Sequence, residues 1–369
     1  MTVPTDVVDA VEDLLQAALD RLSEPGRSGS RRIVAAGGKR LRPELLLRCA
    51  ALGAGDGPGG LDADPAQRVA TLSAAAAVEL LHSATLLHDD LLDGSDTRRG
   101  VAAVHRAEGL LTAVIAGDAL IAQSWRLIAR SGPDDAEDLA DALADMCSGE
   151  ELEAALAFDP AARPLDVLRV AQLKTGALLR AACRIGGRRA GLTEVQVRAL
   201  GAYGSDFGVA LQLVDDVLDV ASEPALLGKP CGADFVAGTV TMPTVYAIAD
   251  GTRSAELLDL LRPGLDGAGA DHARALVLAA GGAERTAELA RSFARRAAKA
   301  MMSVTTTAPT AAFPAAQEAA RALAALPLSY VDAQLEAKVA ARVELLAPRT
   351  SSEDVALLAG LDGHGSAAG

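Results

Sequence analysis

One short acidic motif occurs twice in this chain, each time at the end of an apolar stretch with helical spacing. The first copy is HDDLLD at 88–93 and the second is VDDVLD at 214–219. Residues four apart share one face of a helix, so Asp89 points with Asp93, and the second copy repeats this relation. Crowded carboxylates raise one another's pKa values unless a cation lies among them. We therefore expect two bundle helices to present these aspartates to a common cation.

The composition favours an all-α fold. Half of the 369 residues are hydrophobic but only 2% are aromatic, and alanine and leucine dominate. These residue types favour helix over strand. We expect a single helical domain over 1–346 and a flexible tail over 347–369. Expected helices lie at about 7–22, 41–54, 66–93, 109–130, 136–158, 165–186, 193–220, 242–250, 254–262, 269–280, 282–304 and 314–345.

Three segments between the expected helices are interpreted as loops. A Pro/Gly/Ser loop and a short basic stretch separate the first two helices, and a link joins Arg98 to Arg106. The segment 221–243 is rich in Gly and Pro and carries both charge signs, which is typical of an ordered loop or lid.

Charge and cysteine content narrow the class of protein. The net charge of −14 disfavours nucleic acid or an anionic membrane surface as partner. The four cysteines form no CxxC pair, and no secretory signal precedes them, which favours reduced thiols and a cytoplasmic location. The longest apolar run, 70–87, contains Glu79 and His82 and leads into aspartates, so we expect a buried bundle helix, not a membrane span.

The residue types around the two motifs indicate a diphosphate substrate. Oxygen ligands without His or Cys at ligand spacing favour Mg²⁺. Arg98 and Arg99 follow the first motif, and GGKRLRP supplies Lys39, Arg40 and Arg42. Guanidinium and ammonium groups are the donors that phosphate binds. One such acidic motif alone is typical of a solvated helix end, whereas two flanked by apolar sequence favour a site.

Together these motifs resemble a known family. GGKRLRP, ELLHSATLLHDDLLDGSDTRRG, LKTG, LQLVDDVLD and GKPCGADFVAGTVTMP follow one another over about residues 30–245. In this the chain resembles the trans-isoprenyl diphosphate synthases of the polyprenyl synthetase family. The resemblance implies an isoprenoid-synthase-type helical bundle around a central cavity, usually as a homodimer. It also implies the condensation of isopentenyl diphosphate with an allylic diphosphate by ionisation, condensation and elimination.

The resemblance assigns roles to individual residues. The Mg²⁺ ligands would be Asp89, Asp93 and Asp215, with Asp90, Asp216 and Asp219 in supporting or water-mediated roles. Isopentenyl diphosphate would be bound by Lys39, Arg42, His82 and Arg99. The allylic substrate would be bound by Arg98, Lys174, Thr175, Gln212 and Lys229. Of these, Thr175 and Gln212 would turn oxygen dipoles toward the carbocation.

Product length is expected to depend on the helix before the first motif. Leu81, Ala84 and Thr85 form part of a stripe that runs back from Asp89, along which the growing chain would lie. In the family, bulky aromatics at the fourth or fifth position before the first aspartate give short products. The small residues here favour geranylgeranyl diphosphate, with twenty carbons, or a longer polyprenyl product. The alternative is that the stripe is merely core.

Two other functions remain open from the sequence. A class I terpene cyclase also ionises an allylic diphosphate with aspartates and Mg²⁺, but GGKRLRP and the arginine pair would have no second diphosphate to bind. A non-catalytic partner subunit of a prenyl synthase would be expected to lose aspartates, and both motifs are complete here.

Overall fold

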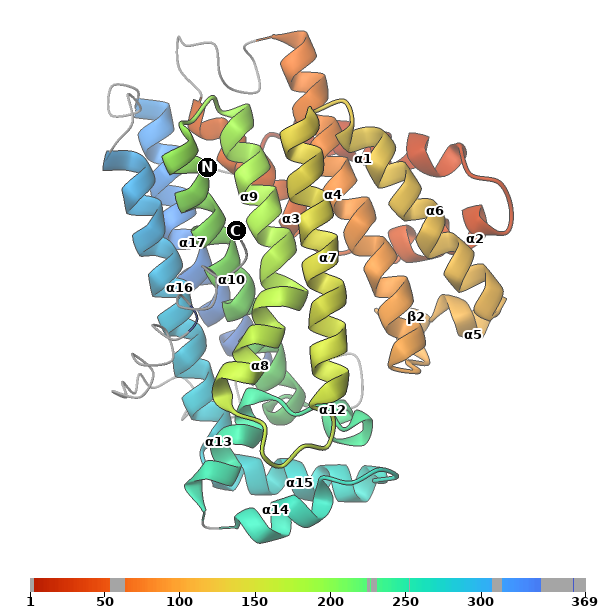
Figure 1. Cartoon of the computed structure of the whole chain (residues 1–369), viewed down its shortest axis with the longest axis vertical. Helices are drawn as coiled ribbons and strands as arrows, with labels where there is room; N and C mark the ends of the chain where they lie inside the picture. Colours follow the sequence, from red (N-terminus) through yellow and green to blue (C-terminus); the bar gives the residue numbers. More distant parts are fainter. Residues whose placement is uncertain are drawn as a thin grey trace. The chain divides into compact units, whose positions relative to one another are not determined.

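The computed structural model describes residues 3–53, 64–223, 226, 231–251, 253–306, 314–339 and 361. These residues are mainly helical, so the all-α prediction is confirmed (Figure 1). They fall into two compact units. The first comprises Met1–Leu143, Leu178–Gly204 and Lys299–Ala324, and the second comprises Ala144–Ala177, Ser205–Ala298 and Ala325–Gly369. The single domain stays a prediction, and the expected tail lies outside the described residues except for Leu361.

The first unit is built around one long apolar helix. Its whole elements are α1 (Thr5–Asp20), α2 (Gly26–Ala35), α3 (Leu41–Ala50), a 3₁₀ turn (Ala51–Gly53), α4 (Pro65–Leu92), the hairpin β1 (Thr97–Arg98) and β2 (Val101–Ala102), α5 (Val104–Glu108) and α6 (Leu110–Ile128). It also contains the start of α7 (Pro133–Ala155), nearly all of α9 (Ala177–Arg189), the start of α10 (Glu194–Ala221), the end of α16 (Gly282–Thr306) and the start of α17 (Pro314–Val339).

The central helix α4 packs against α1, α3 and α6. It begins where the Asp64 carboxylate accepts the N–H of Ala66, with Pro65 in the first turn, and both features favour a helix start. Its middle turns are apolar on every side, and Ala74–Val78 have no exposed surface. Both α4 and α6 are long and apolar enough to span a membrane. However, 78% of the apolar 18-residue window of α4 is buried within the protein, against 50% of the corresponding window of α6.

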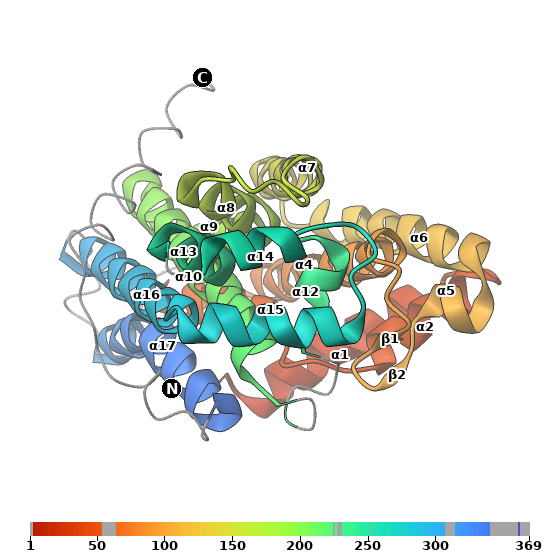
Figure 2. The same cartoon turned by 90° about the horizontal axis from the view of Figure 1, so that it is seen from below.

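The second unit contains the remaining helices. They are the end of α7, α8 (Pro164–Ala171), a π-helical turn (Gln172–Gly176), the end of α10, α12 (Ala233–Ala237), α13 (Met242–Asp250), α14 (Ser254–Leu260), α15 (Gly267–Ala279), most of α16 and the end of α17. Helices α13, α14 and α15 pack on one another, as Figure 2 shows. Phe293 and Tyr246 lie in the core of this unit.

The interpretation of the segment before α3 as a loop was wrong, because GRSGSRRIVA forms α2. Glycine and serine disfavour a helix, but tertiary packing outweighs this preference here. A Cβ at Gly29 would lie only 2.9 Å from the Cβ of Ala116, so glycine lets α2 approach α6 closely. Arg32 and Ser28 of α2 also donate hydrogen bonds to Glu108. The expected link at 98–106 is likewise structured, as the hairpin and α5.

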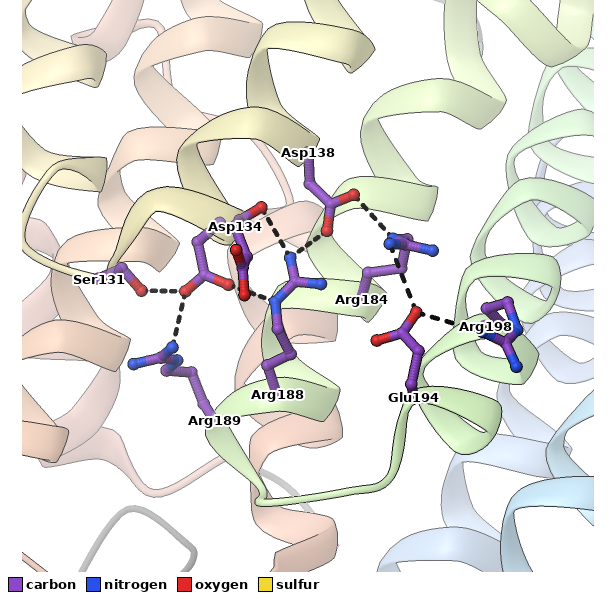
Figure 3. A network of polar contacts seen from close by, with 9 residues as sticks. Ser131, Asp134, Asp138, Arg184, Arg188, Arg189, Glu194 and Arg198 are labelled. Atoms are coloured by element: carbon purple, nitrogen blue, oxygen red, sulfur yellow. Dashed lines mark hydrogen bonds and ion pairs between the residues drawn. The ribbon is translucent and has the colours of Figure 1, made fainter. Parts of the chain in front are cut away.

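An ion-pair network joins the start of α7 to the end of α9 in the first unit (Figure 3). Asp135, which is fully buried near the start of α7, accepts hydrogen bonds from Ser131 and from Nε of Arg188 at 2.7 Å. Arg189 lies 3.2 Å from the same carboxylate, and Arg188 also pairs with Asp138. Acidic residues in the first turn of one helix and arginines in the last turn of α9 suit both helix dipoles.

Candidate active site

The first acidic motif places its aspartates in different surroundings at the end of α4. Asp93 is exposed and caps the helix, donating its N–H to the carbonyl of Asp89 at 2.8 Å, and Asp89 is partly exposed. Asp90 is only 1% exposed, and its Oδ1 accepts hydrogen bonds from Nε of Arg98 at 2.8 Å and from Nη2. Asp89 and Asp93 are therefore accessible to a cation, while Asp90 fixes an arginine.

The β1–β2 hairpin carries both arginines that follow the motif. Its turn consists of Arg99 and Gly100, with φ angles of 53° and 80°, and two-residue type I′ hairpins require positive φ at both turn residues. Arginine is an uncommon choice for this backbone region. Arg99 extends to the glycine-rich loop, where a Cβ at Gly38 would lie 2.8 Å from its Nη1. Gly38 therefore leaves the space that the Arg99 guanidinium fills.

The loop GGKR joins α2 to α3 and is held through Arg40. The Arg40 Nε donates to Glu12 at 2.7 Å, and Nη1 donates to Glu79 at 2.8 Å. Its Nη2 donates to Glu12 and to the carbonyl of Val34. Burial alone would lower the pKa of Arg40, but the two glutamates raise it above its ordinary value. Lys39, next in the loop, is exposed.

His82 lies among the arginines of this region. Its Nε2 is 3.0 Å from Nη1 of Arg42, and because arginine can only donate, Nε2 accepts and the ring proton is on Nδ1. Burial, together with the positive charges of Arg42 and Arg99, holds the pKa of His82 well below its usual value. His82 is therefore neutral. We call the five residues Lys39, Arg40, Arg42, Arg98 and Arg99 the basic cluster.

The second acidic motif shows the same division into exposed and buried aspartates. Asp215 is exposed, whereas Asp216 and Asp219 are buried. Burial, with the charge of Asp215 adding to it, raises the pKa of Asp216 to about 7. Asp219 accepts hydrogen bonds from the backbone N–H groups of Gly232 and Asp234, and so it anchors the segment that follows α10.

A hydrogen-bonded chain runs from the π-helical turn to the second motif. Thr175 donates from Oγ1 to Oε1 of Gln212 at 2.8 Å, and Nε2 of Gln212 donates to Asp216 at 3.0 Å. The π-helical turn and α10 approach closely at two glycines. A Cβ at Gly208 would lie only 2.5 Å from the Cα of Gly176, so glycine is needed there. Turns of π-helix inside longer helices occur frequently at functional sites.

Lys174, in the same π-helical turn, pairs with two carboxylates of α7. Its Nζ lies 2.7 Å from Glu150 and also contacts Glu153. Burial alone would lower the pKa of Lys174, but the two carboxylates raise it above its ordinary value. Gly149 leaves space for the lysine stem, since a Cβ there would lie 2.8 Å from its Cγ. Lys229 lies outside the described residues.

Comparison with known proteins identifies the family. The family model described as polyprenyl synthetase matches residues 27–275, most of the chain. The chain belongs to the polyprenyl synthetase family. It is therefore a prenyltransferase of the trans-prenyl diphosphate synthase type.

Relatives and solved structures agree with this assignment. The chain is 34% identical to the nonaprenyl diphosphate synthase of Mycobacterium tuberculosis, over 79% of this chain and 84% of that relative. It is 32% identical to the geranylgeranyl diphosphate synthase of Methanosarcina mazei, over 65% of this chain and 74% of that relative. A crystal structure of the polyprenyl synthase of Caulobacter crescentus, complexed with calcium and isoprenyl diphosphate, is similar with a TM-score of 0.76. Its sequence is 33% identical, and the match covers 88% of this chain and 95% of that one.

The donor chemistry of this prenyl synthase suits Mg²⁺. Among the described residues no group of three or more His, Cys, Asp or Glu side chains is assembled to hold a metal ion. Mg²⁺ needs no such cage, because it binds one or two carboxylates and completes its shell with waters and phosphate oxygens. The raised pKa of Asp216 reflects burial and excess negative charge, which a bound cation would relieve.

The three residues expected to limit product length differ in accessibility. Leu81 is 1% exposed and Ala84 has no exposed surface, whereas Thr85 is partly exposed and donates from Oγ1 to the carbonyl of His82. Of the three, Thr85 is the one that is partly exposed.

Sequence reasoning missed three glutamates of the site. Glu150 and Glu153 neutralise Lys174, and Glu79, noted only as a charge within an apolar run, binds Arg40. The signal for the first two was their spacing of three on an expected helix, which places both on one face. Nothing in the sequence pairs them with a lysine more than twenty positions later.

Proposed function

We propose that this prenyl synthase condenses isopentenyl diphosphate with an allylic diphosphate and releases a trans-polyprenyl diphosphate of at least twenty carbons. The observation that supports this most strongly is the basic cluster around neutral His82, next to a complete acidic motif. An enzyme that ionises a single diphosphate needs one set of cationic donors. A second set beside the first motif is what a second diphosphate substrate requires.

We propose that several Mg²⁺ ions bind in the active site, with Asp89, Asp93 and Asp215 as ligands. All three side chains are exposed or partly exposed. Bound Mg²⁺ would supply positive charge that stabilises the departing diphosphate. Asp90 would act through Arg98, which it holds by two hydrogen bonds, and Asp219 would act through the segment that it anchors.

The other assigned residues would divide between the two substrates. Lys39, Arg42, His82 and Arg99 would bind isopentenyl diphosphate, and Arg98, Lys174 and Lys229 would bind the allylic diphosphate. Glu150 and Glu153 keep Lys174 protonated, so it carries the positive charge that a phosphate oxygen binds. Because His82 is neutral, it orients Arg42 and adds no charge of its own.

The reaction would proceed in three steps. The allylic C–O bond breaks and diphosphate leaves with the electron pair, held by cationic side chains that offset its charge. Oxygen dipoles of Thr175 and Gln212 face the resulting allylic carbocation, and their mutual hydrogen bond fixes their orientation. The double bond of isopentenyl diphosphate attacks the carbocation, and the released diphosphate then removes a proton to form the new double bond.

Product length is proposed from the helix before the first motif. Thr85 and Ala84 are small, and neither would block a growing chain near the reaction centre. The relatives named above are synthases of geranylgeranyl and nonaprenyl diphosphate, which are products of twenty and of forty-five carbons. Leu81 lies about one helical turn further from Asp89, so it would stop elongation only at a longer product than the other two residues would.

We also propose that the active form is a homodimer in the cytoplasm. The start of α6 presents Leu110, Leu111, Val114 and Ile115 at the surface, and Leu111 is 69% exposed. Adjacent exposed apolar residues favour association. A second copy of the chain, and not lipid, would cover them, because Asp118 and Arg126 on the same helix remain exposed to water. The net charge of −14 disfavours nucleic acid as a partner.

The test uses the purified full chain with Mg²⁺ and an allylic starter of five, ten or fifteen carbons, with and without isopentenyl diphosphate. Products are identified by mass spectrometry. We expect prenyl diphosphates to form only in the incubations that contain isopentenyl diphosphate. Hydrocarbons formed without it would identify a terpene cyclase. An inactive pure chain that regains activity with a second protein would identify a partner subunit.

A further inference from the structure

The conformation of Arg40 is unusual for its place in the chain. It is the residue before α3, and its φ of 48° lies in the left-handed region that favours glycine. Two glycines with positive φ precede Lys39, so the chain uses glycine freely in this loop. Such conformations persist in non-glycine residues only where surrounding contacts determine them. An arginine at this position therefore has a reason beyond the shape of the turn.

The side chain of Arg40 supplies that reason. All three guanidinium nitrogens are bonded within the protein, to Glu12 of α1, Glu79 of α4 and the carbonyl of Val34 at the end of α2. Three helices, α1, α2 and α4, thus meet at one planar group. Since these donors are already engaged, Arg40 is suited to hold its neighbours in place rather than to bind a phosphate.

We call the bonds of Arg40 to Glu12, Glu79 and Val34 the clamp. Glu79 connects it to the rest of the basic cluster. It is 3% exposed and lies three residues before His82, on the same face of α4. The Glu79–Arg40 bond ties the loop to α4 on one side of Lys39. The contact between Arg42 and His82 ties it to the same helix on the other side.

The charge of Glu79 is unfavourable for the function proposed for this region. A buried carboxylate among arginines weakens the positive potential that would attract a diphosphate. A site that only needed charge would bind the anion better without it. Glu79 is therefore better explained by the geometry that it imposes on Arg40.

We propose that Arg40, clamped by Glu79 and Glu12, is a positioning residue that sets Lys39 and Arg42 at the spacing required by isopentenyl diphosphate, without contacting the substrate itself. This inference rests on the proposed assignment of Lys39 and Arg42 to that substrate. The function of Arg40 is then geometric, and each partner of the clamp should affect the same kinetic constant.

The sign of the effect in Glu79→Gln tests this directly. The substitution keeps the size of the side chain and removes its charge. Positioning predicts that KM for isopentenyl diphosphate rises about tenfold, while kcat and KM for the allylic starter stay within about twofold, as expected for lost uniform binding. A role in charge alone predicts the opposite, a lower KM for isopentenyl diphosphate. An unchanged or lowered KM would overturn the proposal.

Arg40→Gly separates the backbone from the side chain. Glycine suits the left-handed conformation better than arginine does, so a residue needed only for the turn would be replaced without loss. The proposal predicts a rise in the same KM, partly reversed in Arg40→Lys, which keeps one charged bond. If Glu79→Gln does not fold, as judged by circular dichroism, Arg40→Gly and Glu12→Gln carry the test. Full affinity for isopentenyl diphosphate in Arg40→Gly would contradict the clamp.

Asp20→Asn is the matched control. Asp20 lies on α1, like Glu12, and pairs with Arg31, but both side chains are at least half exposed. This variant should have wild-type kinetics. Arg42→Ala separates a failure of the substrate assignment from a failure of the positioning inference. If it leaves KM for isopentenyl diphosphate unchanged, the proposed substrate assignment fails; if it raises that KM and the clamp variants do not, the positioning inference alone fails.

Discussion

Asp90 and Arg98 link the first acidic motif to the β1–β2 hairpin, since a nearly fully buried carboxylate oxygen accepts two hydrogen bonds from one guanidinium. We expect Asp90→Asn to release Arg98 and to raise KM for the allylic substrate severalfold. The concentration of Mg²⁺ that gives half-maximal rate should not change. Steady-state kinetics at varied allylic substrate and varied Mg²⁺ measure both constants. A large change in the Mg²⁺ requirement would mean that Asp90 is itself a metal ligand.

Asp89→Ala and Asp215→Ala should each abolish Mg²⁺-dependent turnover. Both side chains are exposed or partly exposed, so helicity by circular dichroism should equal that of the wild type. Loss of activity without loss of helicity is the predicted combination. Full activity in either variant would remove that aspartate from the metal site.

The depressed pKa of His82 predicts a pH dependence of stability. In the unfolded chain a histidine titrates near pH 6.5, whereas folded His82 stays neutral well below that. The unfolded state therefore binds more protons as the pH falls, and the contribution of His82 to stability is lost below about pH 6.5. His82→Gln keeps an acceptor for Arg42 and does not titrate. Urea midpoints at pH 7 and pH 5 should differ less in this variant than in the wild type. Equal differences would contradict the neutral state of His82.

Asp135→Ala should destabilise the fold without a direct effect on catalysis. It leaves Arg188 and Arg189 near an empty position in a buried network, and removing one partner of a buried ion pair costs about 3–5 kcal/mol. Chemical denaturation measures the loss, with Asp20→Asn as the exposed control. KM values below the melting transition should match the wild type. A loss no larger than that of the control would contradict the view that this network holds the ends of α7 and α9 together.

A bulky residue at Thr85 should shorten the product. Thr85 is partly exposed, so Thr85→Phe extends a ring from α4 at little cost to packing. Ala84→Phe should also shorten the product, but Ala84 has no exposed surface, and overpacking a core costs about 1–3 kcal/mol. Mass spectrometry of the products and thermal unfolding of both variants check this. Wild-type products from Thr85→Phe would show that the growing chain does not pass this residue.

The sequence predicted those parts of the fold and site that depend on local pattern. The apolar run before Asp89 indicated a buried helix, and α4 is that helix. Both acidic motifs lie at the ends of helices, as expected. Two aspartates of the first copy and one of the second are accessible. What could not be predicted depends on contacts between distant residues. Helix α2 forms in a glycine- and serine-rich segment because Gly29 packs against Ala116.

The same limit applies to the charged side chains. The lysine in LKTG was predicted as a substrate ligand, but its pairing with Glu150 and Glu153 depends on how α7 packs against the π-helical turn. Glu79 was visible only as a charge in an apolar run, and its partner is a loop residue nearly forty positions earlier. Local spacing identifies which groups are present, whereas the fold determines which of them neutralise one another.

The most direct test of the proposed activity is the incorporation of isotope-labelled isopentenyl diphosphate by the pure chain in the presence of Mg²⁺ and an allylic starter. We expect labelled prenyl diphosphates that differ in mass by whole five-carbon units and reach at least twenty carbons. The absence of label from every product, with the starter consumed or untouched, would contradict the proposed activity.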